Sequence, residues 1–457
     1  MPESSPSTRR ARRWERLAVA GFAAVVAAVV PLVLFVPDDS TASEPESESV
    51  ATQRDEVQTL LDTWAIAVRT GDVDAMGDLV DDQARPGFLE AELSRSAALS
   101  QVPLVDWGYE LSAEPATSAP PDVVARLGAD QAQTHTAYLR YAIEGIDAES
   151  TRKPVAVVVV RRDDGWRLVD DEPGGGRDTW RGPWDFGPLV VETVEPVESV
   201  APVESGGLRP GGTSLVIGHP EQEQLIDAIA GEMRSAVDAV DQVWGQEWAR
   251  SSLVLVTASH DEFTHQVGDR YNGDGVAAVA VSDAVDPDAG RATGQRIVFS
   301  PATGDRLTED GLRAVLRHEL THIAARAHTV DGSPLWILEG YADYIGYRGT
   351  DEDFRRTAPT LSDTVTRTGI PSALPDDAEF AGDRSVLAYE KAWSIAAYTA
   401  DNYGSERLTE LYRRLAHGPV DEPGLDAALT DVLGADTDAF VATWGRWIDR
   451  RLGAPAQ

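Results

Sequence analysis

The segment His318-Glu319-Leu320-Thr321-His322 constrains this chain more than any other. The pattern around it predicts a helix that starts near Thr308, and residues four apart on a helix project from the same face. His318 and His322 can therefore bind one metal ion together. Glu319 lies about 100° further round the helix, where it can act as a general base rather than as a ligand. The alternative is a helix that carries the motif without metal or activity.

A second predicted helix supplies a further carboxylate. Glu339 comes 17 positions after His322, far enough for a turn and a returning helix, and Ser333-Pro334 is a suitable helix start. A catalytic zinc ion takes three protein ligands and keeps one position open, so Glu339 is the predicted third ligand. Asp343, one turn later, is predicted to accept a hydrogen bond from a liganding imidazole. The alternative for Glu339 is an ordinary surface glutamate, which its apolar neighbours disfavour.

The composition limits both the ligands and the partners. The chain of 457 residues has 76 acidic and 40 basic residues, and its formal net charge is -36. Such a surface repels nucleic-acid phosphates, so we expect no nucleic-acid partner. The chain has no cysteine, which excludes disulfides, thiolate ligands and a cysteine nucleophile. Any zinc site must therefore use histidine and carboxylate side chains.

An apolar segment near the N-terminus predicts a membrane anchor. Residues 17–36 form a run of 20 residues without charge, about the length that crosses a bilayer core of ~30 Å as a helix. Arginines precede the run and acids follow it, so the tail at 1–16 is predicted in the cytoplasm and the C-terminal domains outside the cell. We predict an uncleaved, single-pass signal anchor in the cell membrane; a cleaved signal peptide is the alternative. Residues 37–50, rich in Ser, Glu, Asp and Pro, are predicted to be a linker.

Residues 51–172 are predicted to form the first of two domains. Apolar residues at 57, 60, 61, 64, 65 and 68 define one helix face, a short helix follows, and strands are predicted at 137–143 and 155–162, with a hairpin turn at Asp164-Gly165. This order, with the segments "TGDVDAM" and "DDGWRLVDD", resembles the NTF2-like superfamily. The resemblance implies an α+β cone that serves as an enzyme, a binding module or a spacer. No acid–base pair stands out in this region, and His135 is interpreted as structural.

Residues 213–454 are predicted to form the second domain, after a connector at 173–212 with short strands near 189–194. Strands are predicted at 214–217, 253–256, 276–281 and 296–299, and a long helix at 222–244. The segments "VLRHELTHIAARA" and "PLWILEGYADYIGY" resemble the gluzincin clan of zinc metallopeptidases. The resemblance implies a mixed sheet lobe, a helical lobe and zinc in the cleft between them. It also implies peptide or protein substrates, bound by addition to an active-site edge strand, for which "RIVFSP" has the matching position. The predicted fold class is α+β throughout.

The resemblance also bears on the reaction. In gluzincins a later Tyr or His often stabilises the oxyanion, and Tyr389 is the predicted residue here; Tyr347, His328 and His417 are weaker candidates. Glu319 is predicted to deprotonate the zinc-activated water and to pass the proton to the leaving amine. The sequence therefore predicts a membrane-anchored, extracytoplasmic zinc metallopeptidase.

Two alternatives belong to other functional classes. The first is a non-catalytic envelope protein that uses a gluzincin-like scaffold for binding or assembly. The intact Glu319 argues against it, because metal binding alone does not need a general base. The second is a ligand- or partner-binding module in the NTF2-like domain, which a ligand-sized pocket lined by polar groups would favour.

Overall fold

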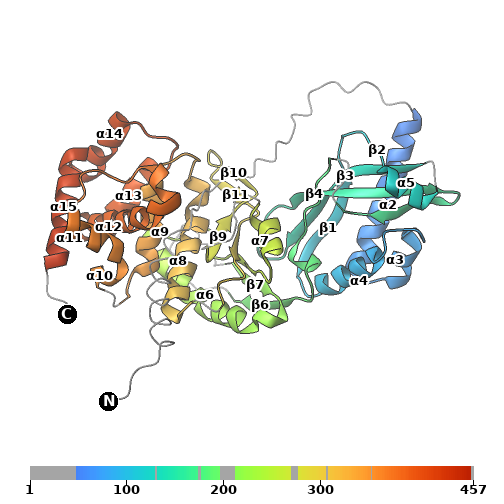
Figure 1. Cartoon of the computed structure of the whole chain (residues 1–457), viewed down its shortest axis with the longest axis horizontal. Coiled ribbons are helices and arrows are strands. Elements are labelled where there is room, and N and C mark those ends of the chain that lie inside the picture. Colours follow the sequence, from blue (N-terminus) through green and yellow to red (C-terminus); the bar gives the residue numbers. More distant parts are fainter. Residues whose placement is uncertain are drawn as a thin grey trace, which may run out of the picture.

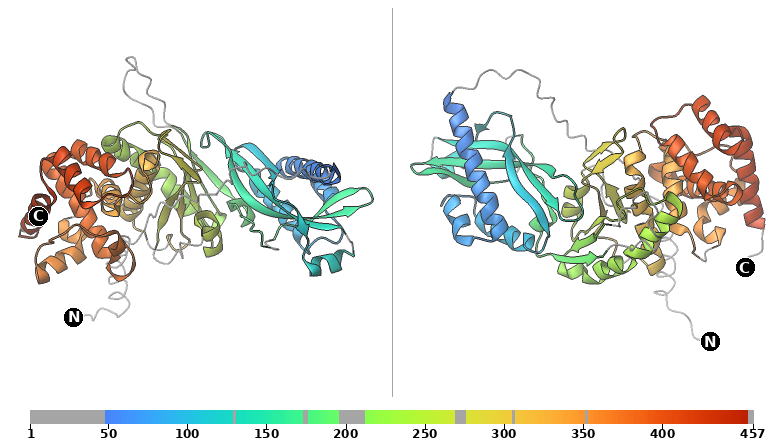
Figure 2. Two further views of the ribbon diagram at one scale, coloured as in Figure 1. Left: turned by 90° about the horizontal axis from the view of Figure 1, so that it is seen from above. Right: turned by 180° about the vertical axis from the view of Figure 1, so that it is seen from behind.

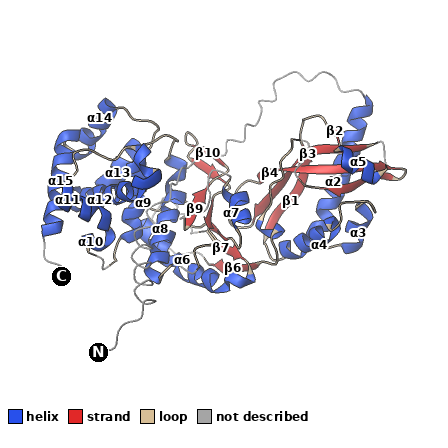
Figure 3. Cartoon of the chain, in the orientation of Figure 1, coloured by secondary structure: helices blue, strands red, loops and turns tan. Residues whose placement is uncertain are grey.

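The computed structural model describes residues 48–128, 131–172, 176–195, 212–268, 276–304, 307–350 and 353–453. Within them the chain is an α+β protein, as predicted. It is elongated, with an N-terminal unit at one end, a second sheet in the middle and an all-helical lobe at the other end (Figure 1, Figure 3).

The predicted membrane span at 17–36 lies outside the described residues. Among the residues that are described, no helix is both long and apolar enough to cross a bilayer. The first described helix, α2, begins at Glu48, inside the segment predicted as a linker.

The N-terminal unit packs helices against an antiparallel sheet with the strand order β1-β3-β4-β5, in which β2 pairs with β3. Figure 2 shows α2 crossing one face of this sheet. The predicted apolar stripe of α2 is buried, and the predicted hairpin joins β4 to β5 at Arg162 and Gly165. The resemblance of this unit to the NTF2-like superfamily stays a prediction. Its elements are α2 (Glu48–Thr70), α3 (Val73–Leu79), α4 (Phe88–Leu99), β1 (Leu104–Leu111), β2 (Thr117–Ser118), α5 (Pro121–Leu127), β3 (Ala132–Ile143), β4 (Thr151–Arg162) and β5 (Gly165–Asp170).

The second unit contains a mixed five-stranded sheet with the order β6-β7-β8-β12-β9. Strands β7, β8 and β12 are parallel, whereas β6 and β9 at the two edges are antiparallel to their neighbours. A separate hairpin of β10 (Ala284–Asp286) and β11 (Arg291–Thr293) follows β9. The strands of the sheet are β6 (Val190–Val194), β7 (Ser214–Gly218), β8 (Leu253–Val256), β9 (Ala278–Val281) and β12 (Arg296–Phe299).

One strand prediction is wrong. The segment "RIVFSP" was expected at the edge of the sheet, but β12 lies inside it, because Ile297 pairs with Val254 on one side and with Ala280 on the other. The edge strand beside β12 is β9. The expected strands at 214–217, 253–256 and 296–299 are otherwise confirmed, and the strand expected at 276–281 begins at Ala278.

Alternate residues of this sheet enter two different cores. Val216, Val254 and Ile297 pack with the helices of the second unit. Their neighbours Leu215, Leu255 and Val298 join a core that also contains Trp107 and Tyr141 of the N-terminal unit and Trp184, which follows that unit. Because successive side chains of a strand point to opposite faces, the sheet is covered on both sides. The two units are therefore joined through a shared apolar core.

Helix α7 (His260–Val267) packs on the face of the sheet that meets the N-terminal unit, because its Phe263 belongs to that core. The other helices of this unit cover the opposite face and build the C-terminal lobe. They are α6 (Glu223–Trp244), α8 (Glu309–Ala325), α9 (Leu335–Tyr347), α10 (Phe354–Thr357), α11 (Pro359–Thr368), α12 (Ser385–Tyr403), α13 (Ser405–Leu415), α14 (Glu422–Leu433) and α15 (Thr437–Gly453). Short 3-10 turns are η2 (Pro183–Asp185), η3 (Pro220–Gln222), η4 (Arg326–His328), η5 (Asp377–Phe380) and η6 (Gly382–Arg384).

The residue that caps the start of α8 was predicted from the sequence, whereas the one that caps the start of α9 was not. Helix α8 begins as expected, with the Thr308 side chain accepting a hydrogen bond from the Gly311 amide. Ser333 is not the N-cap of α9, because its hydroxyl donates to the Val330 carbonyl instead. The carboxylate of Asp377, from η5, accepts from the Leu335 amide at 2.8 Å and satisfies that end of the helix.

Candidate metal centre

Two glycines let α9 pack closely against its neighbours. A Cβ atom at Gly346 would lie 2.8 Å from the Ala314 carbonyl oxygen of α8, and one at Gly340 would overlap the Ala392 carbonyl of α12. Any larger residue at either position would push the helices apart. The close approach fixes the distance between the two helices that carry the predicted ligands.

The predicted ligands converge at the contact between α8 and α9. His318 Nε2 lies 3.1 Å from His322 Nε2, and Glu339 Oε2 lies 3.4 Å from the former and 3.8 Å from the latter. One ligand atom from each residue lies within 4.8 Å of the others, and all three residues are buried. Ligands at 2.0–2.1 Å from a tetrahedral zinc ion are about 3.3 Å apart. The observed spacing therefore fits a zinc ion.

The surroundings of Glu339 also fit a cation. Its side chain is fully buried, and neither carboxylate oxygen has a hydrogen-bond partner among the described residues. Burial alone would raise the pKa of Glu339, but the neighbouring imidazoles outweigh it and hold the pKa below its ordinary value. An ionised carboxylate that is buried without donors is costly unless a cation compensates for it. His318, His322 and Glu339 can thus supply the two nitrogen atoms and one oxygen atom of a catalytic zinc site.

Asp343 supports one of these imidazoles. Its Oδ1 atom lies 2.8 Å from Nδ1 of His318. Since a carboxylate only accepts hydrogen bonds, the contact keeps the proton of the ring on Nδ1 and leaves the Nε2 lone pair toward His322 and Glu339. Burial raises the pKa of Asp343, and the bond to His318 opposes that rise. The structure thus pairs the two residues as the sequence predicted.

Glu319 lies on α8 between the two histidines and is held by the edge strand. Its Oε2 atom accepts a hydrogen bond of 2.8 Å from the Ala280 amide of β9. Burial raises the pKa of Glu319, while the two imidazoles of the motif act in the opposite direction. A carboxylate with a raised pKa is better matched to proton transfer near neutral pH. No sequence pattern predicts the contact with Ala280, because the contact depends on which strand forms the edge of the sheet.

The predicted oxyanion residue lies on another helix. Tyr389 is in the second turn of α12, is buried, and packs its ring edge-on against Phe380 at a centroid distance of 5.1 Å. Of the weaker candidates, His328 packs against the Trp244 ring, and the backbone of His417 pairs with Val330. The oxyanion role of Tyr389 stays a prediction.

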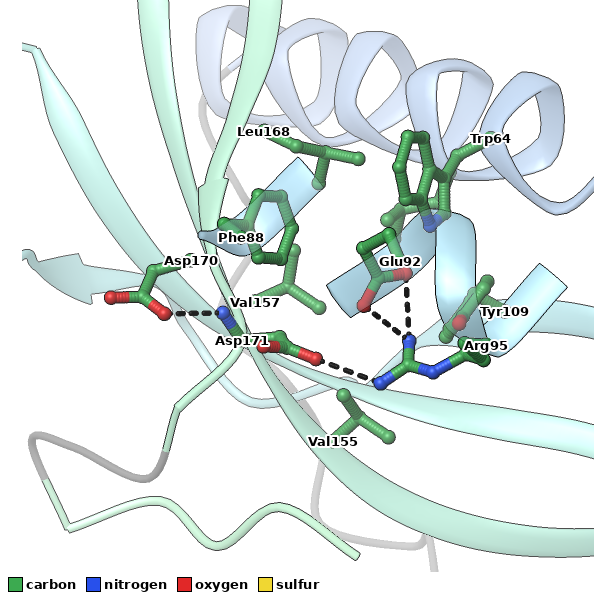
Figure 4. Close-up of a pocket in the computed structure, with 11 residues that line it drawn as sticks. Trp64, Phe88, Glu92, Arg95, Tyr109, Val155, Val157, Leu168, Asp170 and Asp171 are labelled. Carbon is green, nitrogen blue, oxygen red and sulfur yellow. Dashed lines mark hydrogen bonds and ion pairs between the residues drawn. The ribbon is translucent and has the colours of Figure 1, made fainter. Parts of the chain in front are cut away.

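The N-terminal unit contains a buried cluster of charged residues that was not predicted from the sequence. Arg95 of α4 contacts the carboxyl groups of Glu92 and Asp171 (Figure 4). It also forms an ion pair with Asp185 of η2. The spacing of Glu92 and Arg95 on one helix was the available signal. Burial raises the pKa of Glu92 to about 8.

A small cavity adjoins this cluster. Its lining includes Trp64, Phe88 and Tyr109, and its volume of about 20 Å³ leaves room for roughly one water molecule. His135, elsewhere in this unit, contacts Gln133, and burial lowers its pKa to about 4. This cavity is not a ligand-sized polar pocket, so it does not favour the binding-module alternative.

Comparisons with known proteins found solved structures that are similar to this chain. No protein-family model matches the chain, and no curated protein does. An M1 zinc metallopeptidase from Deinococcus radiodurans is similar over 69% of this chain and 62% of its own length, with 16% identity and a TM-score of 0.34. A two-domain M1 zinc metallopeptidase mutant bound to L-arginine is similar over 63% of this chain and 58% of its own length, with 14% identity and a TM-score of 0.34. The chain thus spans less than two thirds of the length of these structures.

Proposed function

We propose that the chain is a zinc-dependent metallopeptidase of the gluzincin type. The observation that carries the proposal is the convergence of His318, His322 and Glu339, with both oxygens of Glu339 buried and without a hydrogen-bond donor in the described part of the chain. Two imidazoles and one carboxylate are a ligand set of catalytic zinc sites. A zinc ion bound there supplies a Lewis acid that polarises a carbonyl group and acidifies water.

Glu319 has the role of general base in this proposal. The Ala280 amide holds one oxygen of its carboxylate, which fixes the side chain beside the two histidines. The carboxylate accepts a proton from the attacking water and delivers it to the leaving nitrogen, so that it ends the reaction ionised again. Asp343 keeps the His318 ring oriented, and Tyr389 remains the proposed oxyanion partner.

Peptides or proteins are the proposed substrates, and the edge strand β9 is the proposed place for them. One side of β9 pairs with β12, and strand β9 itself ends the sheet. An extended peptide can add to such an edge through backbone hydrogen bonds. Because the Ala280 amide donates a hydrogen bond to the Glu319 carboxylate, this edge lies next to the proposed base.

The location of the enzyme is also a proposal and rests on the sequence. The uncharged run at 17–36 with arginines before it supports a single-pass anchor with the catalytic unit outside the cell. Membrane fractionation of cells that express the full chain tests this, together with added protease on intact cells. Recovery of the chain in the soluble cytoplasmic fraction would contradict the anchor.

The activity is tested on the purified full-length chain. We expect about one zinc ion per chain and cleavage of members of a peptide library. Glu319→Gln should keep the zinc and lose ~10²–10⁴-fold in rate, whereas Asp363→Asn, an exposed change on α11, should alter neither. If the wild type binds zinc but cleaves no peptide, the result would favour the non-catalytic scaffold. The absence of zinc would refute both the site and the mechanism.

A further inference from the structure

The strand that holds Glu319 is also held by the N-terminal unit. Two residues after the end of β9, the carboxylate of Asp283 forms an ion pair with Lys153 and accepts a hydrogen bond of 3.1 Å from Thr151 Oγ1. Both partners belong to β4 of the N-terminal unit. Asp283 therefore connects the proposed active-site strand to a different part of the fold.

Asp283 is fixed from its own unit as well. Arg296 of β12 donates to its carboxylate at 3.0 Å, and its backbone amide donates to the Thr293 carbonyl at 2.9 Å. Burial alone would raise the pKa of Asp283, but the two cations hold it below its ordinary value. The carboxylate is thus ionised at neutral pH and is shared by Lys153 and Arg296.

Lys153 is rigidly placed for this contact. It is one of two lysines in the whole chain, and its side chain is 2% exposed. Its ammonium also lies 5.5 Å from the centre of the Trp180 ring, a favourable cation–π contact. Trp180 in turn donates to the His265 carbonyl of α7 at 2.8 Å. A buried ammonium with these neighbours has little freedom to reach another partner.

The short segment from Ala280 to Asp283 contacts both the proposed base and the end of its helix. Ala280 donates to Glu319, and Ser282 accepts a hydrogen bond from Arg326, which follows α8 in η4. A displacement of Asp283 therefore reaches α8 through Ser282, Val281 and Ala280, a distance of at most three residues along the chain. Interiors are close-packed, so such a shift is not absorbed locally.

We propose that Lys153 is a positioning residue of the catalytic unit: by holding Asp283, the N-terminal unit fixes β9 and, through the Ala280 amide, the carboxylate of Glu319. This inference rests on the peptidase function proposed above. It makes the N-terminal unit a part of the catalytic assembly and not only a spacer between the membrane and the enzyme.

The test uses the full-length chain with Lys153→Met, which keeps much of the side-chain volume and removes the charge. Hydrogen exchange of the segment 278–283 should become several-fold faster, kcat should fall about 10-fold through misplacement of the base, and zinc content should stay at one per chain. Lys153→Arg restores a cation and should recover most of kcat.

Glu149→Gln is the matched control. Glu149 pairs with Arg291 at 2.8 Å across the same interface, but both side chains are more than half exposed. Breaking this pair should change neither the exchange of 278–283 nor kcat, because exposed ion pairs contribute little. If Lys153→Met does not fold, Asp283→Asn removes the same pair with almost no change of size.

Each outcome decides one proposal. Unchanged exchange of 278–283 in both Lys153→Met and Asp283→Asn overturns the coupling. Faster exchange with unchanged kcat overturns the positioning role and leaves a structural contact. If the wild type cleaves no peptide, the proposed function fails, and hydrogen exchange still decides whether Lys153 holds β9.

Discussion

Nδ1 of His318 lies 2.8 Å from Oδ1 of Asp343, across the contact between α8 and α9. Partners of liganding histidines typically contribute 10–100-fold to metal affinity. We therefore expect Asp343→Asn to bind one zinc ion with about 10–100-fold lower affinity, as measured by competition with a chelator. Asp363→Asn, an exposed change on α11, should leave the affinity unchanged. Equal affinity of wild type and Asp343→Asn would show that the contact does not support a ligand.

Zinc should also stabilise the fold, because the buried carboxylate of Glu339 has no hydrogen-bond donor among the residues that the structure describes and a cation would compensate its charge. A ligand present at 100 times its Kd stabilises the folded state by about 2.7 kcal/mol. Thermal unfolding with and without a chelator should show a higher Tm with zinc for the wild type and for Glu319→Gln. Glu339→Gln should lose most of the shift. If Glu319→Gln loses it equally, Glu319 is a ligand and not the base.

The parts of the site geometry that could be predicted from the sequence are those encoded locally. His318 and His322 share a face because of helix periodicity, and Asp343 follows Glu339 by one turn. The return of α9 onto α8 needed only a short turn and an apolar helix. The convergence of His318, His322 and Glu339 could therefore be predicted from two segments of one polypeptide stretch.

The errors concern relations between distant residues. Strands β9 and β12 are both four residues long and mostly buried, so their patterns do not reveal which of them forms the edge. The cap of α9 comes from Asp377, 42 residues after Leu335, and Lys153 meets Asp283 over 130 residues. Such contacts follow from the packed fold, and no local periodicity encodes them.

The glycine contacts of α9 predict a sharp steric effect. At Gly340 an added methyl group would overlap the Ala392 carbonyl of α12, and such overpacking typically costs about 1–3 kcal/mol. Gly340→Ala should therefore lower the free energy of unfolding by about that amount and weaken zinc binding, since Glu339 is the preceding residue. Urea denaturation and zinc titration measure the two effects.

The control for this prediction is Gly231→Ala. Gly231 is an exposed residue within α6 and has open space where a Cβ would lie. The better helix propensity of alanine should raise the free energy of unfolding by up to about 1 kcal/mol. If both substitutions destabilise the protein equally, the close contact between α9 and α12 is not the cause.

The buried Glu92 predicts a pH dependence of stability. Burial, assisted by the charges of Asp171 and Asp185, raises its pKa to about 8 from an ordinary 4.5, and Arg95 does not offset this because it is shared with those two carboxylates. Between these two pH values the folded state keeps a proton that the unfolded chain releases. The contribution of Glu92 to stability therefore falls as the pH rises from about 4.5 to about 8.

Glu92→Gln isolates this contribution, because glutamine does not titrate. The free energy of unfolding from urea denaturation at pH 5, 6, 7 and 8 should fall less steeply for the variant than for the wild type, so that the difference favours the variant most at pH 8. Glu90→Gln, an exposed change on the same helix, should follow the wild-type slope. Parallel curves for wild type and Glu92→Gln would mean that Glu92 is ionised in the folded protein, with Arg95 as its effective partner.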